Sequence, residues 1–339
     1  MNYKNEKQMK TRKLGAQGLE IPMIGLGCMG MSSFASTGDI YGKADEKESI
    51  ATIHRSLELG GNFLDTADLY GPFENERLIA RAIRGKRNEF ILASKFGFEI
   101  DDNDQVTWRI NGQPDYIRKS IERSLKNLDT NVIDLYYMHR PDPNVPIEET
   151  VGAMGELVTA GKVKYLGISE VNAEQIRRAH ATFPITAVQN EISLFGREAE
   201  TNGVYDLTQE LGIGLVAYSP LGRGFITGEI KSPDDIPEDD FRRLIPRFQG
   251  EQFYKNLDLV RELEKIGKEK DVTSSQLALA WLIQKGIVPI PGTKRVRYVE
   301  QNIAATDIQL TAEELQRIEA ILPVGLNTGS RDVNIPLQS

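Results

Sequence analysis

Cysteine, histidine and positive charge are scarce in this chain of 339 residues, and each shortage excludes a class of protein. The single cysteine, Cys28, cannot form a disulfide within the chain, which is typical of a reducing compartment, and we expect a cytoplasmic protein. One cysteine and three scattered histidines make no metal-ligand cluster, so we expect no metal. The formal net charge of −8 argues against nucleic acid as a partner, because phosphate binding needs an excess of lysine and arginine.

Long apolar runs are missing as well. No uninterrupted apolar segment is long enough to span a bilayer, so we expect no membrane partner. Residues 1–10 are polar and no apolar run follows them, so no signal peptide is expected. Hydrophobic residues still make up 40% of the chain, which is enough for a large buried core, and the length fits one large domain or two ordinary ones.

Short apolar segments alternate with segments of helical periodicity over most of the chain. Apolar strands, each followed by an amphipathic helix, are typical of a parallel sheet covered by helices. We expect strands at 21–27, 62–65, 90–95, 132–138, 163–169, 187–192, 214–218 and 287–290, and helices at 46–59, 74–83, 114–128, 147–160, 173–180, 204–211 and 274–284. Eight such strands favour an α/β fold of the closed (β/α)8 TIM barrel type over an open doubly wound sheet.

Several segments lie outside this repeat. We expect an N-terminal hairpin at 13–20, extra helices at 254–270 and 311–322, and tails at 1–9 and 324–339. The second extra helix begins with the capping-box sequence Thr311-Ala312-Glu313-Glu314. No linker or low-complexity run divides the chain, so a single domain over residues 1–339 is the simplest expectation.

Ionisable side chains end three successive predicted strands. Asp65 and Lys95 end two of them, His139 follows the third, and Tyr70 lies shortly beyond Asp65. In a barrel of this kind, functional groups lie at the C-terminal ends of the strands. Taken singly, Asp65 with Lys95 fits a structural ion pair, and His139 fits a satisfied core histidine. The four residues together favour a functional site, because lysine and aspartate are rarely buried unless they are paired.

A tyrosine beside a lysine suits proton donation. A phenol has an unperturbed pKa of about 10. A nearby ammonium lowers that pKa, and a carboxylate keeps the ammonium charged. These residues predict Tyr70 as a general acid tuned by Lys95 and Asp65, with His139 orienting the oxygen that receives the proton. This pattern indicates carbonyl reduction with hydride from a cofactor. The alternative is a Schiff-base aldolase with Lys95 as nucleophile, which Asp65 opposes by keeping the lysine protonated.

Two segments match phosphate-binding patterns. Gly25-Leu26-Gly27-Cys28-Met29-Gly30 matches G-x-G-x-x-G, but residues 31–38 predict a loop where a dinucleotide fingerprint needs a helix. The turn Pro291–Arg297 is the better candidate, because it places three cations before a helix in an acidic chain. That charge favours NADP over NAD, and a solvated basic surface is the alternative explanation.

Seven segments together resemble the aldo-keto reductase family over nearly the whole chain. They are Gly61–Ala67, Tyr70-Gly71, the strand ending at Lys95, Tyr136–His139, Val188–Asn190, Tyr218–Gly222 and Pro291–Lys294, each at the expected strand end and in the expected order. The resemblance implies a (β/α)8 barrel that takes hydride from NADPH and reduces the aldehyde or ketone carbonyl of a small molecule, an activity of the alcohol dehydrogenase (NADP+) type. The phosphate turn is similar to that of the plant and microbial branch, which includes pyridoxal reductase-like members and general aldehyde reductases.

The resemblance also implies a role for each matching residue. Tyr70 would be the acid, Lys95 and Asp65 would tune it, and His139 would orient the carbonyl. Ser169 and Gln189 would hold the nicotinamide amide, while Tyr218 would stack on the nicotinamide ring. The other implied cofactor contacts are Cys28, Met29 and Asp65 at the nicotinamide ribose, Ser219, Pro220, Leu221, Gly222 and Gly224 over the pyrophosphate, and Gly292, Thr293, Lys294, Arg297, Gln301 and Asn302 at the adenosine phosphate.

One position departs from the family. Many members have asparagine directly after the serine that matches Ser169, and here Glu170 stands there, so the hydrogen bond of that asparagine to the amide does not carry over. Phe34, Trp108 and Phe225 are expected to line the substrate pocket. The alternative function is an NADP-binding regulatory module of the same fold with little turnover, against which the complete set of four polar residues argues.

Overall fold

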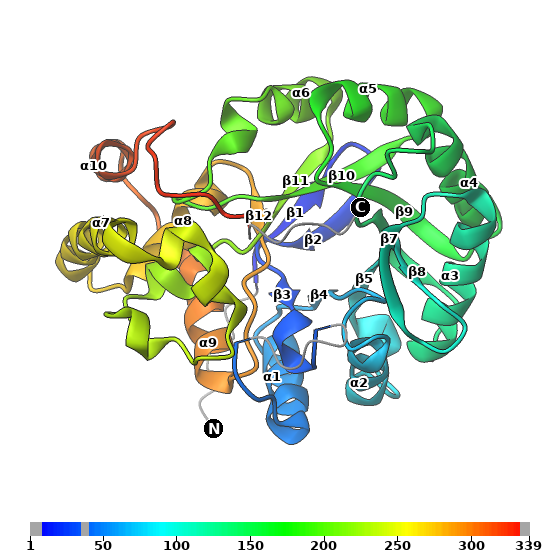
Figure 1. Cartoon of the computed structure of the whole chain (residues 1–339), viewed down its shortest axis with the longest axis horizontal. Coiled ribbons are helices and arrows are strands. Elements are labelled where there is room, and N and C mark those ends of the chain that lie inside the picture. The colour runs from blue at the N-terminus through cyan, green and yellow to red at the C-terminus, as the bar shows by residue number, and fades with distance from the viewer. Residues whose placement is uncertain (1–8, 35–40, 333–339) are drawn as a thin grey trace, which may run out of the picture.

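Residues 9–34 and 41–332 are described by the computed structural model, and in this part of the chain eight parallel strands curl into a barrel surrounded by helices (Figure 1). In order around the barrel, the strands are β3 (Leu26–Gly27), β4 (Phe63–Asp65), β5 (Ile91–Phe96), β8 (Ile133–Met138), β9 (Val163–Ser169), β10 (Ile185–Glu191), β11 (Gly214–Tyr218) and β12 (Val288–Pro289). The last strand returns to the first, since the Gly25 amide donates to the Pro289 carbonyl (3.0 Å) and the Gly27 amide donates to the Pro291 carbonyl (3.2 Å). The (β/α)8 TIM barrel predicted from the sequence is confirmed.

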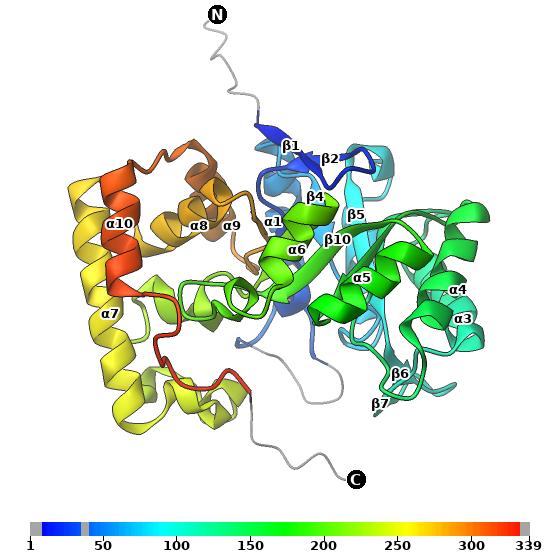
Figure 2. The ribbon, with the colours of Figure 1, turned by 90° about the horizontal axis from the view of Figure 1, so that it is seen from above.

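Helices cover the outside of the barrel, as the alternating pattern predicts. The helices that belong to the strand–helix repeat are α1 (Glu46–Glu58), α2 (Glu74–Ala82), α3 (Pro114–Asn127), α4 (Ile147–Thr159), α5 (Ala173–Thr182), α6 (Val204–Leu211), α8 (Ser274–Gln284) and α9 (Val296–Ala304). The two extra helices are α7 (Gly250–Glu269) and α10 (Ala312–Ile321), which pack against each other on one side of the barrel (Figures 1 and 2). No helix in the described part of the chain is long and apolar enough to cross a membrane.

Side-chain caps set where several of these helices begin. At the start of α1, Asp45 accepts a hydrogen bond from the Glu48 amide (2.8 Å). At the start of α10, Thr311 and Glu314 form the capping box expected from the sequence, because each side chain accepts from the backbone amide of the other residue. These bonds satisfy amides that have no partner within the first helical turn.

A hairpin closes one end of the barrel. β1 (Thr11–Leu14) pairs antiparallel with β2 (Leu19–Pro22), and its apolar side chains pack against the barrel interior. The hairpin takes up residues to Pro22, so the first barrel strand is only Leu26–Gly27 and the predicted strand at 21–27 is wrong in its first part. Pro22 has no amide to continue a ladder. A side chain at Gly25 would come within 2.6 Å of the Phe63 ring, so only glycine allows this close approach of the backbone.

A second hairpin lies at the opposite end of the molecule (Figure 2). β6 (Phe98–Ile100) and β7 (Val106–Ile110) pair antiparallel within a segment that the sequence predicted only as a loop. Tyr116 of α3 holds this hairpin, since its hydroxyl accepts from the Ile100 amide (2.9 Å) and donates to the Phe98 carbonyl (2.9 Å). The hairpin thereby brings aromatic side chains to the C-terminal ends of the barrel strands.

The segment after α10 is held against the barrel. Thr328 Oγ1 donates to the Phe195 carbonyl (2.8 Å), and Asn256 of α7 donates from Nδ2 to the Thr328 carbonyl (2.9 Å). The first part of the predicted tail at 324–339 is therefore fixed by tertiary contacts. Its last part, 333–339, and residues 1–8 of the N-terminal tail lie outside the described residues.

Candidate active site

The four polar residues singled out from the sequence meet at the C-terminal ends of β4, β5 and β8, which are neighbours in the barrel. Asp65 is the last residue of β4, Lys95 lies near the end of β5, and His139 directly follows β8. Tyr70 lies in the turn after β4, where its side chain is buried. The C-terminal ends of parallel strands share one edge, which is why residues far apart in sequence come together here.

The centre of the site is a buried ion pair. Lys95 Nζ donates to Asp65 Oδ1 and to the Thr66 carbonyl (2.9 Å), and the Lys95 and Asp65 side chains are 1% and 4% exposed. Gln189 of β10 donates from Nε2 to the other carboxylate oxygen of Asp65 (2.9 Å). A charge buried this deeply needs a partner, and each of these two groups supplies one for the other. This pairing also opposes a Schiff-base role for Lys95, which would need a neutral amine.

Tyr70 and His139 face the ion pair. Lys95 Nζ lies 5.5 Å from the centre of the Tyr70 ring, and the Tyr70 and His139 rings meet edge to face with centroids 6.1 Å apart. Burial lowers the pKa of His139, and the charges of Lys95 and Arg140 lower it further, so the imidazole is neutral. Among the described residues, its buried Nδ1 has no hydrogen-bond partner. A neutral imidazole has one N–H to donate, which suits it to orienting an oxygen beside Tyr70.

The direction of the Tyr70 pKa shift differs from the sequence prediction. Burial raises the pKa of the phenol, and the negative charge of Asp65 raises it further, whereas the sequence predicted a lowering by Lys95. Burial has the largest effect on this pKa, and the sequence alone did not show how deeply the Tyr70 side chain lies. Tyr70 therefore keeps its proton over the ordinary pH range, and it can act as a proton donor without being a phenolate at rest.

Aromatic side chains surround Tyr70 and His139 on the open side of the site. The Phe34 ring lies 6.1 Å from the Tyr70 ring and 6.4 Å from the Trp108 ring. Phe98 of β6, which the sequence analysis missed, packs 5.2 Å from His139 and 6.3 Å from Trp108. The predicted lining residues Phe34 and Trp108 thus lie beside the four polar residues. Phe98 lies just beyond the strand that contains Lys95. This position indicates a place at the site only once the hairpin of β6 and β7 is known.

Phe225 does not line this pocket, contrary to the sequence prediction. It is fully buried, and its ring packs 5.6 Å from Phe195, 5.1 Å from Phe248 and 5.1 Å from Phe253. These contacts place Phe225 in the hydrophobic core beneath α7. A loop that follows a strand end can turn its apolar side chains inward, and the sequence alone does not reveal the direction.

The ends of β9 and β10 offer polar atoms for an amide. Ser169, the last residue of β9, is 1% exposed, and within the described part of the chain its hydroxyl has no hydrogen-bond partner. Gln189 lies on the neighbouring strand and contacts Asp65, so it faces the same interior. An unpartnered buried hydroxyl is costly, and a carboxamide placed against it would satisfy it. These residues therefore fit the nicotinamide end of a dinucleotide. Cys28 and Met29 adjoin this place, because the Cys28 amide donates to the Asp65 carbonyl (2.9 Å).

The loop after β11 is tightly curled. Tyr218 ends the strand and is half-buried, and the chain then passes through positive φ angles at Ser219 (48°), Gly222 (59°), Arg223 (57°) and Gly224 (91°). Positive φ in residues other than glycine is strained and is common at binding sites. The binding of a pyrophosphate by this backbone at 219–224, which includes Pro220 and Leu221, stays a prediction.

The basic turn after β12 lies beside the first barrel strand. Gly27 and Gly292 form a parallel β-bridge, which brings the turn to the end of β3. Lys294 Nζ donates to the carbonyl of Gly42, and Arg295 pairs with Glu48 of α1 (2.7 Å). The other predicted contacts follow from there into α9, namely Thr293, Arg297, Gln301 and Asn302. Their binding to an adenosine phosphate stays a prediction.

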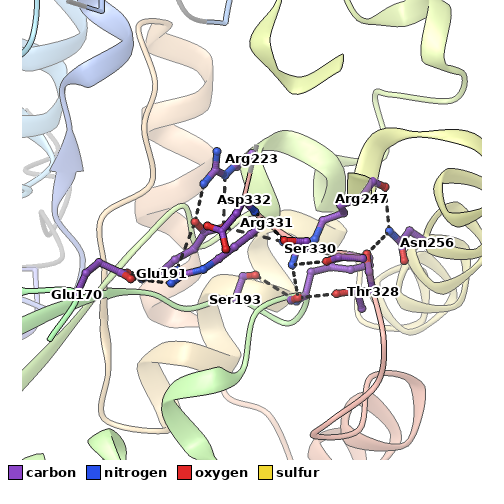
Figure 3. Close-up of polar contacts among 12 residues, drawn as sticks. Glu170, Glu191, Ser193, Arg223, Arg247, Asn256, Thr328, Ser330, Arg331 and Asp332 are labelled. Atoms are coloured by element: carbon purple, nitrogen blue, oxygen red, sulfur yellow. Dashed lines mark hydrogen bonds and ion pairs between the residues drawn. The ribbon is translucent and has the colours of Figure 1, made fainter. Parts of the chain in front are cut away.

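Glu170, the departure from the family pattern, is held by charged groups. Its carboxylate accepts two hydrogen bonds from Arg331, Nη2–Oε2 at 2.6 Å and Nη1–Oε1 at 3.2 Å, and one from the Glu191 amide (2.9 Å) (Figure 3). Arg331 lies 161 positions away along the chain. No local sequence pattern points to such a pair, so the sequence analysis missed both Arg331 and Glu191.

A family model described as Aldo/keto reductase family matches residues 24–323. This chain belongs to the aldo-keto reductase family. The match begins before β3 and ends after α10, so it includes the whole barrel and the four polar residues. The family assigns the general chemistry, which is the oxidoreduction of carbonyl compounds.

Individual aldo-keto reductases are similar along nearly their whole length. The aldo-keto reductase yakc (NADP(+)) of Schizosaccharomyces pombe is 45% identical over 314 residues, covering 91% of this chain and 90% of that protein. The probable aldo-keto reductase 1 of Glycine max is 43% identical over 330 residues, covering 96% of this chain and 93% of that protein.

Solved structures of the same family are similar as well. The glycerol dehydrogenase AKR11B4 of Gluconobacter oxydans has a TM-score of 0.83 at 27% identity, over 94% of this chain and 96% of its own. An aldo/keto reductase of Klebsiella pneumoniae, solved in complex with NADP and acetate, has a TM-score of 0.72 at 25% identity, over 93% of this chain and 96% of its own.

Proposed function

We propose that this protein is an NADPH-dependent reductase of small aldehydes or ketones, with Tyr70 as the proton donor. The observation that carries the proposal is the buried pair of Lys95 and Asp65 beside Tyr70 and His139, next to the aromatic rings of Phe34, Phe98 and Trp108. The similarity to the yakc reductase of S. pombe, named with NADP(+), supports the choice of cofactor. In the reverse direction, the same residues would oxidise an alcohol, as in an alcohol dehydrogenase (NADP+).

The chain has a group for each part of the cofactor. Ser169 and Gln189 would hold the nicotinamide carboxamide, and Tyr218 would stack against the ring. Lys294 and Arg297 would bind the adenosine phosphate. When bound, NADPH would supply a hydride from its nicotinamide ring.

The proton is handled by the chain itself. His139, neutral at ordinary pH, would donate a hydrogen bond to the substrate carbonyl oxygen and hold it next to the Tyr70 hydroxyl. Tyr70 would then donate its proton to that oxygen. The negative charge left on the phenol would be stabilised by the Lys95 ammonium, which is already in place and so costs no reorganisation. Aromatic rings at Phe34, Phe98 and Trp108 would limit the access of water.

The proposal is tested by the oxidation of NADPH with a panel of aldehydes and ketones, followed as loss of its absorbance. Replacing Tyr70 by Phe removes the acidic proton and keeps the ring, so turnover should fall by roughly 100- to 10,000-fold. The affinity for NADPH, measured by calorimetry, should stay close to that of the unmodified protein.

Two results would contradict the proposal. Full turnover by Tyr70→Phe would remove Tyr70 from its role. Tight NADPH binding with no consumption on any carbonyl in the panel would favour the alternative function, an NADP-binding regulatory module. Cys28, the single cysteine, is compatible with the cytoplasm as the proposed location.

A further inference from the structure

Five charged side chains from five segments converge beside the ends of β9 and β10 (Figure 3). They are Glu170 after β9, Glu191 at the end of β10, Arg223 in the loop after β11, Arg247 just before α7 and Arg331 in the C-terminal segment, and we call them the charge cluster. With two carboxylates and three guanidinium groups, the cluster has one more cation than anion. Each of its members comes from a different part of the chain, so the cluster joins the C-terminal segment to the strand ends.

Glu170 connects this cluster directly to the residues proposed to bind the amide. It follows Ser169 and has left-handed backbone, with φ at 54°. Its amide donates to the Gln189 carbonyl (3.1 Å), and its carboxylate accepts from the Glu191 amide (2.9 Å). Glu170 thus contacts the backbone of β10 at Gln189 and again at Glu191, and it directly follows Ser169.

Arg331 is the cation that holds Glu170. The guanidinium and the carboxylate meet in a two-point contact, and Arg331 Nη1 also lies 3.6 Å from Glu191 Oε2. Burial alone would raise the pKa of Glu170, but the hydrogen bonds and charge of Arg331 outweigh it and lower that pKa. A planar guanidinium fixes the orientation of a carboxylate in this two-point geometry, which a lysine cannot do.

The other two arginines of the charge cluster, Arg223 and Arg247, contact groups other than the Glu170 carboxylate. Arg223 forms its own ion pair with Glu191 (2.8 Å). Arg247 donates to the Phe195 carbonyl (2.8 Å) and lies 4.0 Å from Glu191. Neither makes a hydrogen bond to Glu170 in the described structure. The charge of Arg140 also lowers the pKa of Glu170, but among the described residues the two guanidinium hydrogen bonds to its carboxylate come from Arg331.

We propose that Arg331 is a positioning residue of the nicotinamide site, acting through Glu170 on Ser169 and Gln189. This inference rests on the proposed function, because it concerns how the carboxamide end of NADPH is held. The C-terminal segment would then contribute to the cofactor site through Glu170. Without Arg331, the Glu170 carboxylate is left half-enclosed without its cation and moves toward water, and the turn that presents Ser169 moves with it.

The experiment compares two ligands by calorimetry. NADPH reports on the whole site, whereas 2′,5′-ADP carries only the adenosine phosphate end, which lies at the basic turn. Arg331→Met should weaken NADPH binding by roughly 10- to 100-fold, because a small displacement of positioning groups has effects of this size. Binding of 2′,5′-ADP should change by less than about twofold.

Two further variants distinguish a positioning role of Arg331 from a general loss of structure. Arg317→Met is the matched control, because Arg317 also makes a two-point contact to a glutamate, Glu269, but does so between α10 and α7. It should change neither affinity. Glu170→Asn removes the carboxylate, so adding Arg331→Met to it should cost much less than Arg331→Met costs alone.

If Arg331→Met does not fold, Arg331→Lys carries the test. It keeps the charge and loses the two-point contact, so NADPH should weaken by a smaller factor while 2′,5′-ADP again stays constant. Equal losses for the two ligands, no loss for either, or full additivity with Glu170→Asn would each overturn the proposal. Absence of NADPH binding by the unmodified protein would instead overturn the proposed function, so the two failures are distinguishable.

Discussion

The two ends of the barrel each contain a buried aspartate paired with a lysine, and the two pairs differ in what surrounds the lysine. At the C-terminal end of the strands, Lys95 and Asp65 are both buried, at 1% and 4% exposed. At the N-terminal end, Asp134 of β8 is 7% exposed, but its partner Lys164 is 55% exposed. Asp134 also accepts from Arg87 (2.7 Å) and from the Leu92 amide (2.9 Å).

This difference decides what each pair can do. The Lys164 ammonium reaches water, so it remains solvated whether or not Asp134 binds it, and the pair mainly ties β8 to β5 and β9. The Lys95 side chain is 1% exposed, so removing Asp65 would leave its charge buried without an anion. In the proposed reaction, the buried cation beside Tyr70 would stabilise negative charge on the phenol, whereas the solvated cation at the closed end would contribute to stability.

Removing each carboxylate in turn is the strongest test of this comparison. Asp65→Asn leaves Lys95 buried without an anion, so we expect a loss of about 3–5 kcal/mol in the free energy of unfolding and at least a roughly 100-fold loss of turnover. Asp134→Asn should cost about 1–3 kcal/mol and leave turnover unchanged, since its cations can turn toward water. Urea denaturation and NADPH oxidation measure both quantities. An equal loss of turnover in Asp134→Asn and Asp65→Asn would contradict the different roles assigned to the two ion pairs.

A third buried acid, Glu76 of α2, should respond to pH in the opposite direction from Asp134. Burial raises the pKa of Glu76 to about 7, even though Ser94 donates to its carboxylate (2.6 Å). The folded protein therefore binds a proton that the unfolded chain has lost, and this contribution to stability is present below about pH 4.5 and is lost as the pH rises through about 7. For Asp134, burial alone would raise the pKa, but Lys164, the Leu92 amide and Arg87 lower it, so its contribution is lost as the pH falls.

Glu76→Gln tests whether the contribution of Glu76 to the free energy of unfolding decreases as the pH rises. The unmodified protein should lose about 3 kcal/mol of stability through this group between pH 4.5 and 8, at about 1.4 kcal/mol for each unit of pKa shift. The glutamine variant lacks this carboxyl and should lack its part of the slope, whereas Asp68, whose pKa burial also raises, is present in both proteins. Urea denaturation of the two proteins at both pH values measures the difference. Parallel pH dependence in the two proteins would mean that Glu76 is ionised in the folded state.

Cations at the two ends should also differ in their effect on the cofactor. Neutralising Lys294 and Arg297 at the open end, as Lys294→Met with Arg297→Met, should weaken NADPH by roughly 10- to 100-fold, because each is expected to make a charge-assisted hydrogen bond to phosphate. NADH lacks the extra phosphate and should weaken much less. Lys164→Met at the closed end is the control and should leave both affinities unchanged. Equal losses for NADPH and NADH in the double variant would mean that these cations do not recognise the extra phosphate.

Local patterns in the sequence were enough for the parts of the site that lie on strand ends. Asp65, Lys95 and His139 each follow a short apolar run, and the alternation of strands and helices implies that such ends meet at one edge. The same reasoning misplaced Phe225, because the loop after β11 turns that side chain into the core under α7. It also gave the wrong direction for the pKa of Tyr70, which depends on burial and on the distance to Asp65.

By itself, the sequence determined the barrel, the order of its strands and the identity of the four polar residues beside the pocket. These follow from periodicity and chain order, which short segments carry without knowledge of their neighbours. Only the tertiary structure decided that Arg331 binds Glu170, that Phe98 reaches His139 and that Tyr70 keeps its proton. Each of these depends on two groups far apart in the chain, whose distance and burial are set by the packing of the whole barrel.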